Sequence, residues 1–191
     1  MNEVIMNEYD NVKKMIIEDI DPDRKQGFID LMNYLENDTE WLTSPASTRY
    51  HCSYESGLLD HSVSVAKTIL RLKKILAPEI KNSTALLVGL LHDVGKEGQY
   101  IMKPPTVKQQ QAGFPGSIVY NEDITWMEHA SRSLHIISKF INLTEEEWSA
   151  IEYHDQPYYG QSCAFRSNKL MTLLQNSDYW SACYLEVGGH K

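Results

Sequence analysis

LLVGLLHDVGK, residues 86–96, is the stretch that decides the fold of this chain. Its apolar residues follow one another without the regular polar positions of an amphipathic helix, which predicts a helix over Ala85–Gly95 that is apolar almost all round. A helix of that kind buries every face, so it should lie at the centre of the fold. The stretch also contains the pair His92–Asp93, so these two polar side chains are expected at the end of a buried helix.

The segments around this central helix also show helical spacing of apolar residues. One helix face, ended by Pro78, is formed by Leu58, Val65, Ile69, Leu72 and Leu76. Further helices are expected over Val12–Ile20, Gly27–Leu35, about Trp126–Ile141 and Asn168–Tyr184, and from a capping box at Thr144 and Glu147 to about His154. Asn82 or Ser83 is the predicted cap of the central helix, residues 39–56 and 103–116 are expected to be irregular, and Ser117–Tyr120 is a modest strand candidate. The sequence therefore predicts an all-α helical bundle with five core helices plus N-terminal helices.

The bulk composition is that of a globular protein with one substantial core. The chain has 191 residues, of which 42% are hydrophobic and 23% charged. Its longest uncharged apolar run, Ala85–Leu91, is far too short to cross a bilayer, and the acidic N-terminus lacks the features of a signal peptide. We therefore expect a cytoplasmic protein without a membrane partner. A homo-oligomer is compatible with this composition.

The charge balance and the cysteines exclude several classes of protein. A formal net charge of −8, without a run of basic residues, does not predict the basic surface that binds long duplex nucleic acid. A small anionic substrate is compatible with it if metals or a few local cations supply a positive field. Cys52, Cys163 and Cys183 form no CxxC pair, so free thiols are expected rather than a disulfide framework or a zinc knuckle.

Four histidines and two aspartates fall on or beside the buried faces of five predicted helices. They are His61, His92, Asp93, His129, His154 and Asp178. An ionised carboxylate without a partner costs several kcal/mol when it leaves water, so this placement requires compensation. Divalent cations provide it, because imidazole nitrogen and carboxylate oxygen suit manganese, iron, nickel, zinc or cobalt. The pattern predicts a metal centre whose metal is one of these.

Such a centre suits phosphate chemistry. An aspartate can bridge two metals through its two oxygens, and two metals about 4 Å apart can clamp a phosphate and activate water. Lys96 lies four residues after His92, on the same predicted helix face. Its ammonium group has no lone pair for a metal, so Lys96 is predicted to hold a phosphate oxygen or to stabilise charge in the transition state.

The order of these residues resembles the HD-domain superfamily of metal-dependent phosphohydrolases. The motifs concerned are GLLDHS (57–62), LLVGLLHDVGK (86–96), MEHA (127–130), IEYHD (151–155) and LLQNSD (173–178). The order H…HD…H…H…D is similar to the two-metal branch, which includes the HD-GYP cyclic-dinucleotide phosphodiesterases and the HD-type 3′–5′ exoribonucleases. The lead-in PASTRYHCSYESGLLDHS (45–62) looks most like that of the exoribonuclease group, and the resemblance covers roughly residues 45–180.

The resemblance implies a division of roles among the candidate residues. His61, His92, Asp93 and Asp178 would hold one metal, and Asp93 would bridge to a second metal held by His129 and His154. Lys96 would contact phosphate. The implied HD-type domain spans residues 45–185, with an N-terminal helical extension over 1–44 packed on it and a C-terminal tail over 186–191. The chain departs from the family pattern at Gly57, where some HD-GYP members have an acidic ligand, and at Asp155, where a second histidine is common.

Other cationic and aromatic residues are weaker candidates for the site. Arg49, Arg166 and Lys169 are predicted substrate contacts, because guanidinium and ammonium groups bind phosphate oxygens, although isolated residues of this kind are more often solvated surface charges. His51 has two readings, as a residue that lines the pocket and as part of the loop surface.

The predicted function is hydrolysis of a phosphomonoester or phosphodiester in a small, nucleotide-like phosphorylated substrate. Three alternatives remain open at this stage. They are a di-iron oxygenase built on the same ligands, a 3′–5′ exonuclease acting on short single-stranded nucleic acid, and a non-catalytic nucleotide-binding domain.

Overall fold

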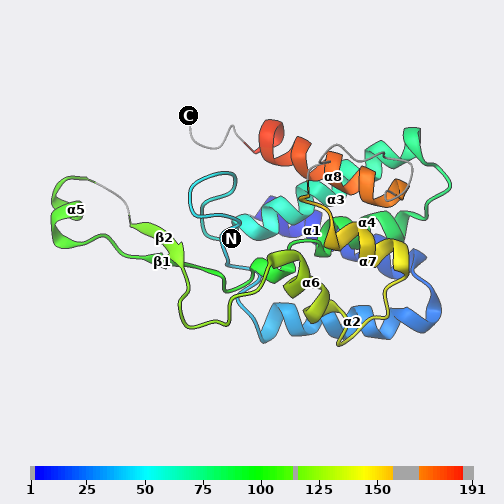
Figure 1. The fold of residues 1–191 in the computed structure, drawn as a ribbon, viewed down its shortest axis with the longest axis horizontal. Coiled ribbons are helices and arrows are strands. Elements are labelled where there is room, and N and C mark those ends of the chain that lie inside the picture. Colours follow the sequence, from blue (N-terminus) through cyan, green and yellow to red (C-terminus); the bar gives the residue numbers. More distant parts are fainter. Residues whose placement is uncertain (1–2, 114–115, 157–167, 187–191) are drawn as a thin grey trace.

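The structure is a computed structural model that describes residues 3–113, 116–156 and 168–186. Most of these residues form a helical bundle, from which a hairpin arm projects (Figure 1). In chain order the elements are α1 (Glu3–Asp19), α2 (Pro22–Asn37), α3 (Gly57–Leu76), α4 (Asn82–Leu91), the 3₁₀ turn η1 (Val94–Lys96), β1 (Tyr100–Lys103), α5 (Val107–Gln111), β2 (Ser117–Tyr120), α6 (His129–Ile137), α7 (Glu145–Glu152), α8 (Lys169–Trp180) and the π-helical turn η3 (Ser181–Leu185). The predominantly α-helical class predicted from the sequence is confirmed.

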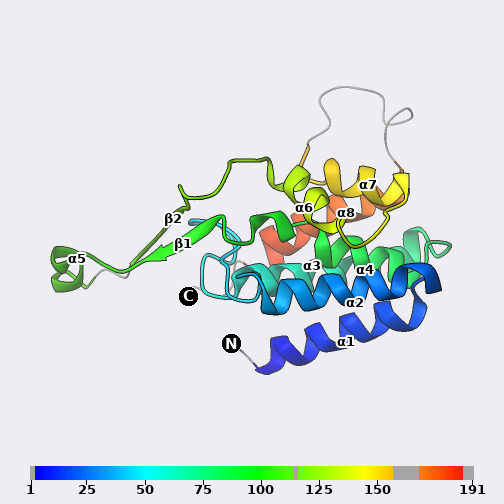
Figure 2. The same cartoon turned by 90° about the horizontal axis from the view of Figure 1, so that it is seen from below.

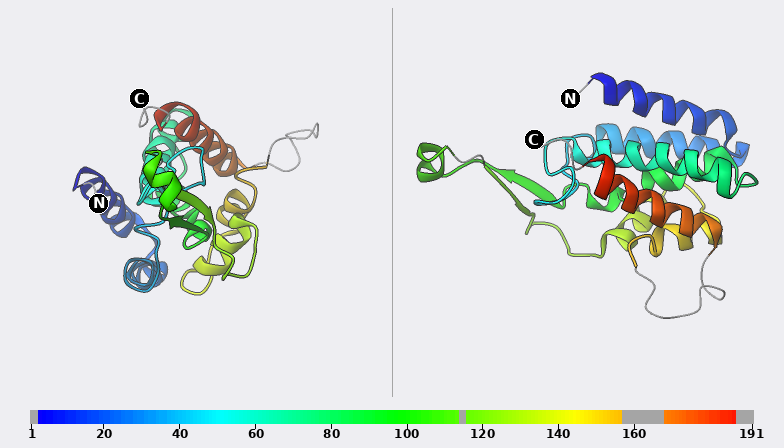
Figure 3. Two further views of the ribbon diagram at one scale, coloured as in Figure 1. Left: turned by 90° about the vertical axis from the view of Figure 1, so that its left-hand side faces the viewer. Right: turned by 90° about the horizontal axis from the view of Figure 1, so that it is seen from above.

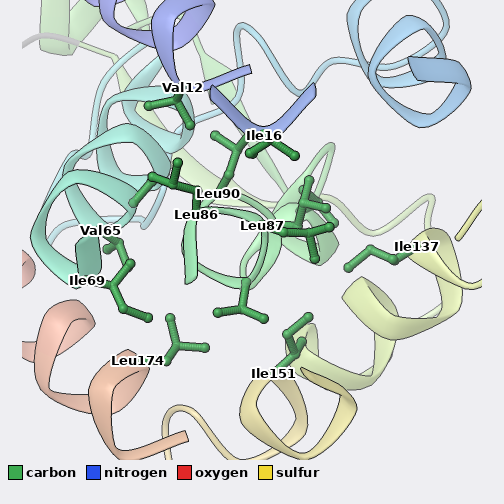
Figure 4. Close-up of a cluster of buried hydrophobic side chains, with 14 of the residues drawn as sticks. Val12, Ile16, Val65, Ile69, Leu86, Leu87, Leu90, Ile137, Ile151 and Leu174 are labelled. Carbon is green, nitrogen blue, oxygen red and sulfur yellow. The ribbon is translucent and has the colours of Figure 1, made fainter. Parts of the chain in front are cut away.

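Helix α4 lies at the centre of the bundle, as its uniform apolar character predicts. The side chains of Leu86, Leu87 and Leu90 are at most 1% exposed. Figure 4 shows them among apolar side chains from α1, α3, α6, α7 and α8. The core therefore surrounds the element that ends on His92–Asp93.

Both ends of α4 differ from the prediction. The helix begins at Asn82 and its N-cap residue is Lys81, so neither Asn82 nor Ser83 is the cap. The amide of Ser83 instead donates to Asp19 Oδ2 at the end of α1, at 2.8 Å. The α-helix ends at Leu91 instead of Gly95, and the chain tightens into the 3₁₀ turn η1. The predicted continuous helix over residues 85–95 is therefore wrong in its last turn.

The capping box at the start of α7 is confirmed. Thr144 Oγ1 accepts from the amide of Glu147 at 3.2 Å, and Glu147 Oε2 accepts from the amide of Thr144 at 2.9 Å. The Glu147 carboxylate is buried and also pairs with Arg24 of α2 at 2.7 Å, so the cap connects α7 to the N-terminal helices. By contrast, α6 begins at His129, later than the predicted start at Trp126, whose side chain is exposed.

A hairpin arm stands away from the bundle in Figures 1 and 2 and in the right-hand view of Figure 3. Strand β2 confirms the strand candidate at Ser117–Tyr120, and it pairs antiparallel with β1, with Tyr100 opposite Tyr120. The partner strand and the short α5 fall next to or within the segment predicted to be irregular. The sequence pattern missed them because β1 has only four residues and α5 only five.

The N-terminal helices share the core of the bundle. Tyr9 and Ile16 of α1 and Phe28 of α2 are fully buried within the same cluster as the side chains of α4. The domain boundaries at 1–44, 45–185 and 186–191 stay predictions. Among the described helices, none combines the length and the hydropathy that a transmembrane span requires, and the cytoplasmic location also stays a prediction.

The packing around α4 predicts a large difference between two Leu→Ala substitutions. Leu90→Ala removes a fully buried side chain and should lower the free energy of unfolding by about 2–5 kcal/mol, because the lost burial and the cavity both count. Leu76→Ala at the end of α3 is the matched control, since Leu76 is 64% exposed and should change stability little. Urea denaturation of both variants measures the difference. Equal destabilisation would contradict the central position of α4.

Candidate metal centre

Two polar side chains at the end of α4 lie in the core. His92 is the C-cap residue of α4, and its Nδ1–H donates to the carbonyl oxygen of Gly89 at 2.9 Å. Asp93 leaves the helical conformation with φ −109° and ψ 9° before η1 begins. The side chains of His92 and Asp93 are 0% and 1% exposed. The change from α-helix to 3₁₀ turn therefore sets the direction of both side chains.

Gly89 allows α3 to lie close enough to contribute His61. A Cβ on Gly89 would lie 2.8 Å from the Cα of Ala66 in α3, so only glycine permits this approach. The buried His61 then places its Nε2 3.4 Å from Asp93 Oδ2. The same atom lies 3.1 Å from Oδ1 of Asp178, which reaches the site from the end of α8.

Gly95 has the same role for α6. A Cβ there would lie 2.1 Å from the carbonyl oxygen of His129, and the amide of Gly95 donates to Ser133 Oγ at 2.8 Å. Arg132 also donates to the carbonyl oxygen of Gly95, at 2.7 Å. These contacts hold the start of α6 against η1, and they bring His129 Nε2 to 3.5 Å from Asp93 Oδ1.

The end of α7 supplies the last histidine. The Nδ1–H of His154 donates to the carbonyl oxygen of Ile151 at 2.7 Å, in the same way that His92 bonds Gly89. The Nε2 of His154 lies 3.5 Å from Asp93 Oδ1 and 3.2 Å from the Nε2 of His129. The second oxygen of Asp93 therefore faces a second pair of histidines.

Two subsites share the Asp93 carboxylate. The first subsite is formed by Asp93 Oδ2, His61 Nε2, His92 Nε2 and Asp178 Oδ1, and the second by Asp93 Oδ1, His129 Nε2 and His154 Nε2. The separations measured within them run from 3.1 to 4.0 Å. Ligand atoms with metal bonds of about 2.0–2.1 Å are about 2.8–3.4 Å apart for bond angles between 90° and the tetrahedral value, and about 4 Å apart when they lie opposite each other. The spacing of these atoms fits divalent metal ions.

The hydrogen bonds of the histidines favour the same conclusion. A carbonyl oxygen can only accept, so Nδ1 of His92 and of His154 carries a proton, and in a neutral ring the lone pair is then on Nε2. Among the described residues, Nε2 of His61, Nε2 of His92 and Oδ1 of Asp93 are buried without a hydrogen-bond partner. Buried acceptors that face one another are costly unless a cation lies between them. The donor set therefore fits a metal at each subsite.

Electrostatics distinguish the histidines of the first subsite. Burial lowers the pKa of His61, but the carboxylates of Asp178, Asp93 and Glu186 beside the ring outweigh it and raise the pKa well above the ordinary value. The pKa of His92, which lacks such carboxylate hydrogen bonds, is lowered by burial to about 3. Without a metal, His61 is therefore protonated and positively charged at the place where a metal ion would lie, while His92 stays neutral.

Lys96 lies beside the Asp93 carboxylate, which the two subsites share. Its Nζ is 2.6 Å from Asp93 Oδ2, and its side chain is 13% exposed. Burial raises the pKa of Asp93, but Lys96 and the surrounding histidines outweigh it and hold that pKa well below its ordinary value. In the same way Asp93 raises the pKa of Lys96 against the effect of burial. Both groups are therefore charged, and a cation stands at the edge of the two subsites.

The predicted substrate contacts are not gathered in the same way. The guanidinium of the exposed Arg49 lies over the ring of Tyr50 on the loop before α3. Lys169 forms an ion pair with Glu79 at the start of α8, nine residues before Asp178, which is about 13 Å along a helix. Arg166 lies outside the described residues. Among the residues that the structure describes, neither Arg49 nor Lys169 contacts a residue of the two subsites.

Three further residues lie near the subsites, and the sequence pattern did not assign them to the site. The ring of His51 lies 4.6 Å from the ring of His61, so of its two readings the structure favours the one beside the site. Asp155 Oδ2 is 3.6 Å from His129 Nε2. Glu186, in the predicted tail, contacts His61 Nδ1 at 3.0 Å. No spacing rule could have identified Glu186, because this contact spans 125 residues of chain.

Comparisons with known proteins show which family this sequence resembles. The sequence model of one protein family, described as the HD domain, matches residues 58–176, which is more than half of the chain. The chain is similar to dihydroneopterin 2′,3′-cyclic phosphate phosphodiesterase from Methanocaldococcus jannaschii, with 36% identity over 64 residues. The alignment covers 31% of this chain and 26% of the relative, so the chain spans about a quarter of the relative's length. No solved structure gave a significant match.

The close approach at Gly95 predicts a selective effect on the second subsite. Gly95→Ala must displace the start of α6, because the new Cβ would lie 2.1 Å from the His129 carbonyl oxygen. We expect the number of bound metal ions to fall from two to one, and the free energy of unfolding to fall by about 1–3 kcal/mol. Elemental analysis measures the metal. Ser138→Ala, at the far end of α6, is the control and should retain both ions.

The raised pKa of His61 predicts that metal affinity depends on pH. A metal at the first subsite must displace the proton that His61 holds in the metal-free protein. Affinity should therefore fall as the pH falls below this raised pKa, by about tenfold per pH unit for one proton, and should level off above it. His92, with a pKa of about 3, adds nothing near neutrality. Chelator competition between pH 6 and pH 9 measures this, and a flat profile would show that His61 is neutral.

Proposed function

The chain belongs to the HD domain family, and we propose that it is a metal-dependent phosphohydrolase that cleaves a phosphate ester in a nucleotide-like small molecule at a two-metal centre. The observation that carries this proposal is the position of the Asp93 carboxylate. Oδ2 of Asp93 lies 3.4 Å from His61 Nε2, and Oδ1 lies 3.5 Å from His154 Nε2, so each oxygen faces a different set of ligand atoms. A carboxylate placed in this way would hold two neighbouring divalent ions, one on each oxygen.

The charge of the site supports an anionic substrate only when the metals are present. Asp93 and Asp178 contribute two negative charges, and the chain as a whole has a formal net charge of −8. Two divalent ions would reverse the sign of the local charge, since bound cations are often the largest charges in a site. When bound, such ions supply Lewis-acid polarisation of a phosphate and activation of water for attack on phosphorus.

Residues of the chain supply the positioning. His92 and His154 are held by carbonyl oxygens of their own helical turns, so their rings have little freedom to rotate. We propose that Lys96 exchanges part of its interaction with Asp93 for a phosphate oxygen of the substrate, because its ammonium group lies at the edge of both subsites. His129, whose side chain is 18% exposed, faces the solvent side of the second subsite, where a substrate would enter.

The name of the archaeal relative guides the choice of substrates. That protein is called a phosphodiesterase of a 2′,3′-cyclic phosphate. A cyclic phosphate is a small phosphodiester, which agrees with the nucleotide-like substrate expected here. We therefore propose 2′,3′-cyclic nucleotides as the first compounds to test, beside ordinary phosphomonoesters and linear phosphodiesters.

Asp93→Asn tests the two-metal proposal directly. The amide lacks the charge and one of the two oxygens of the bridge, so metal content should fall, and hydrolysis should fall by more than the roughly 10–100-fold typical of outer-shell changes. The measurement is phosphate or alcohol release from the substrate panel with Mn²⁺, Fe²⁺ or Ni²⁺. Asp123→Asn, at an exposed aspartate, is the control and should keep full activity. Retained turnover in Asp93→Asn would rule out the mechanism, and oxygen consumption by the iron form would favour an oxygenase.

A further inference from the structure

We propose that Glu186 is a positioning residue of the first subsite, whose carboxylate fixes the tautomer and orientation of the His61 ring. This inference rests on the metal centre of the proposed function and is independent of the substrate. Both carboxylate oxygens of Glu186 lie within hydrogen-bond distance of His61 Nδ1, at 3.0 and 3.1 Å. The two side chains are 8% and 0% exposed, so water does not compete strongly for this bond.

His61 needs a partner from outside its own helix, unlike His92 and His154. His92 and His154 follow the ends of α4 and α7, where the last carbonyl oxygens of a helix are free to accept from Nδ1. His61 lies inside α3, where the carbonyl oxygens are occupied by the helix itself. Without Glu186, either ring nitrogen of His61 could carry the proton. The carboxylate places the proton on Nδ1 and leaves the Nε2 lone pair toward Asp93 and Asp178.

Glu186 is itself held in place from two sides. The turn η3 is fixed to α3 by the buried Ser181, whose Oγ lies 3.4 Å from Thr68 Oγ1, and the amide of Glu186 donates to the carbonyl oxygen of Ser181 at 3.1 Å. On the other side, the Cys52 thiol donates to Glu186 Oε2 at 3.3 Å. Burial raises the pKa of Cys52 to about 12, so Cys52 stays a protonated donor.

The loop before α3 holds Cys52 in an unusual backbone conformation. Cys52 has φ +46°, in the left-handed region that residues other than glycine rarely adopt. Gly57 makes the arrangement possible, since a Cβ at Gly57 would lie 2.0 Å from the Cys52 carbonyl oxygen. The loop before α3 and the turn after α8 thus meet at the carboxylate of Glu186. Cys52 and Glu186 both lie outside residues 58–176, the range that the family model matches.

The test compares metal binding in Glu186→Ala, Glu186→Gln and the wild-type protein. The alanine variant should bind one of its two ions on the order of 10–100-fold more weakly, as is typical when the outer-shell partner of a histidine ligand is lost. The ion at the second subsite should bind with unchanged affinity. Glu186→Gln keeps an oxygen that accepts from Nδ1, so it should recover most of the loss. Glu55→Ala, at an exposed carboxylate of the neighbouring loop, is the matched control and should behave as wild type. Titration with Mn²⁺ or Co²⁺ against a chromophoric chelator gives both affinities.

Proton NMR of the Co²⁺-loaded protein reports on His61 itself. The Nδ1–H protons of cobalt-bound histidines give strongly shifted, exchangeable signals. In Glu186→Ala one of these signals should move or exchange rapidly with water, while those of His92 and His154 stay unchanged. A purely structural defect would instead alter all the signals together.

The outcomes separate this inference from the proposed function. If the wild-type protein binds two ions, and Glu186→Ala keeps both affinities and all the histidine signals, the role of Glu186 is overturned and the metal centre stands. Failure of Glu186→Gln to recover affinity would also overturn it, because the hydrogen bond would then not be the cause. If the wild-type protein binds no metal, the proposed function and this inference fail together.

Discussion

A carboxylate buried at the end of an apolar helix costs several kcal/mol unless it is compensated, and Asp93 is in that position with 1% of its side chain exposed. The arrangement of the helices around α4 provides the compensation. Lys96 contacts one oxygen of Asp93, and histidines from different helices face both oxygens. Each of these partners depends on the packing of its own helix against α4 or η1. The stability of the bundle and the chemistry of the site are therefore properties of the same contacts.

Two glycines allow the close helix contacts that bring these partners to Asp93. Gly89 brings α3 close to α4, and Gly95 brings α6 close to η1, because in each case a Cβ would overlap the neighbouring backbone. The histidine rings are then fixed by hydrogen bonds from Nδ1. For His92 and His154 the acceptor is a carbonyl oxygen of the same turn, so the ring orientation is encoded locally. His61 depends on a distant carboxylate, which makes the first subsite sensitive to how the C-terminal turn packs.

The fold could be predicted well where the signal is local or strongly periodic. The central position of α4 follows from its apolar residues, and the Thr144–Glu147 cap follows from a four-residue pattern. The end of α4 was predicted wrongly, because the apolar pattern continues through Val94 although the α-helix ends at Leu91. Strand β1 was missed because four residues carry too little periodicity.

For the candidate site, the sequence by itself determined which residue types were available and in what order along the chain. Buried aspartates need a compensating charge and buried histidines need polar partners, so their positions on apolar faces were informative without coordinates. Only the tertiary structure decided that the two oxygens of Asp93 face different histidines. The tertiary structure also placed Glu186 beside His61 and Lys169 with Glu79. The physical reason is that hydrogen bonds and ion pairs act over a few ångströms in space, whatever the separation of their partners along the chain.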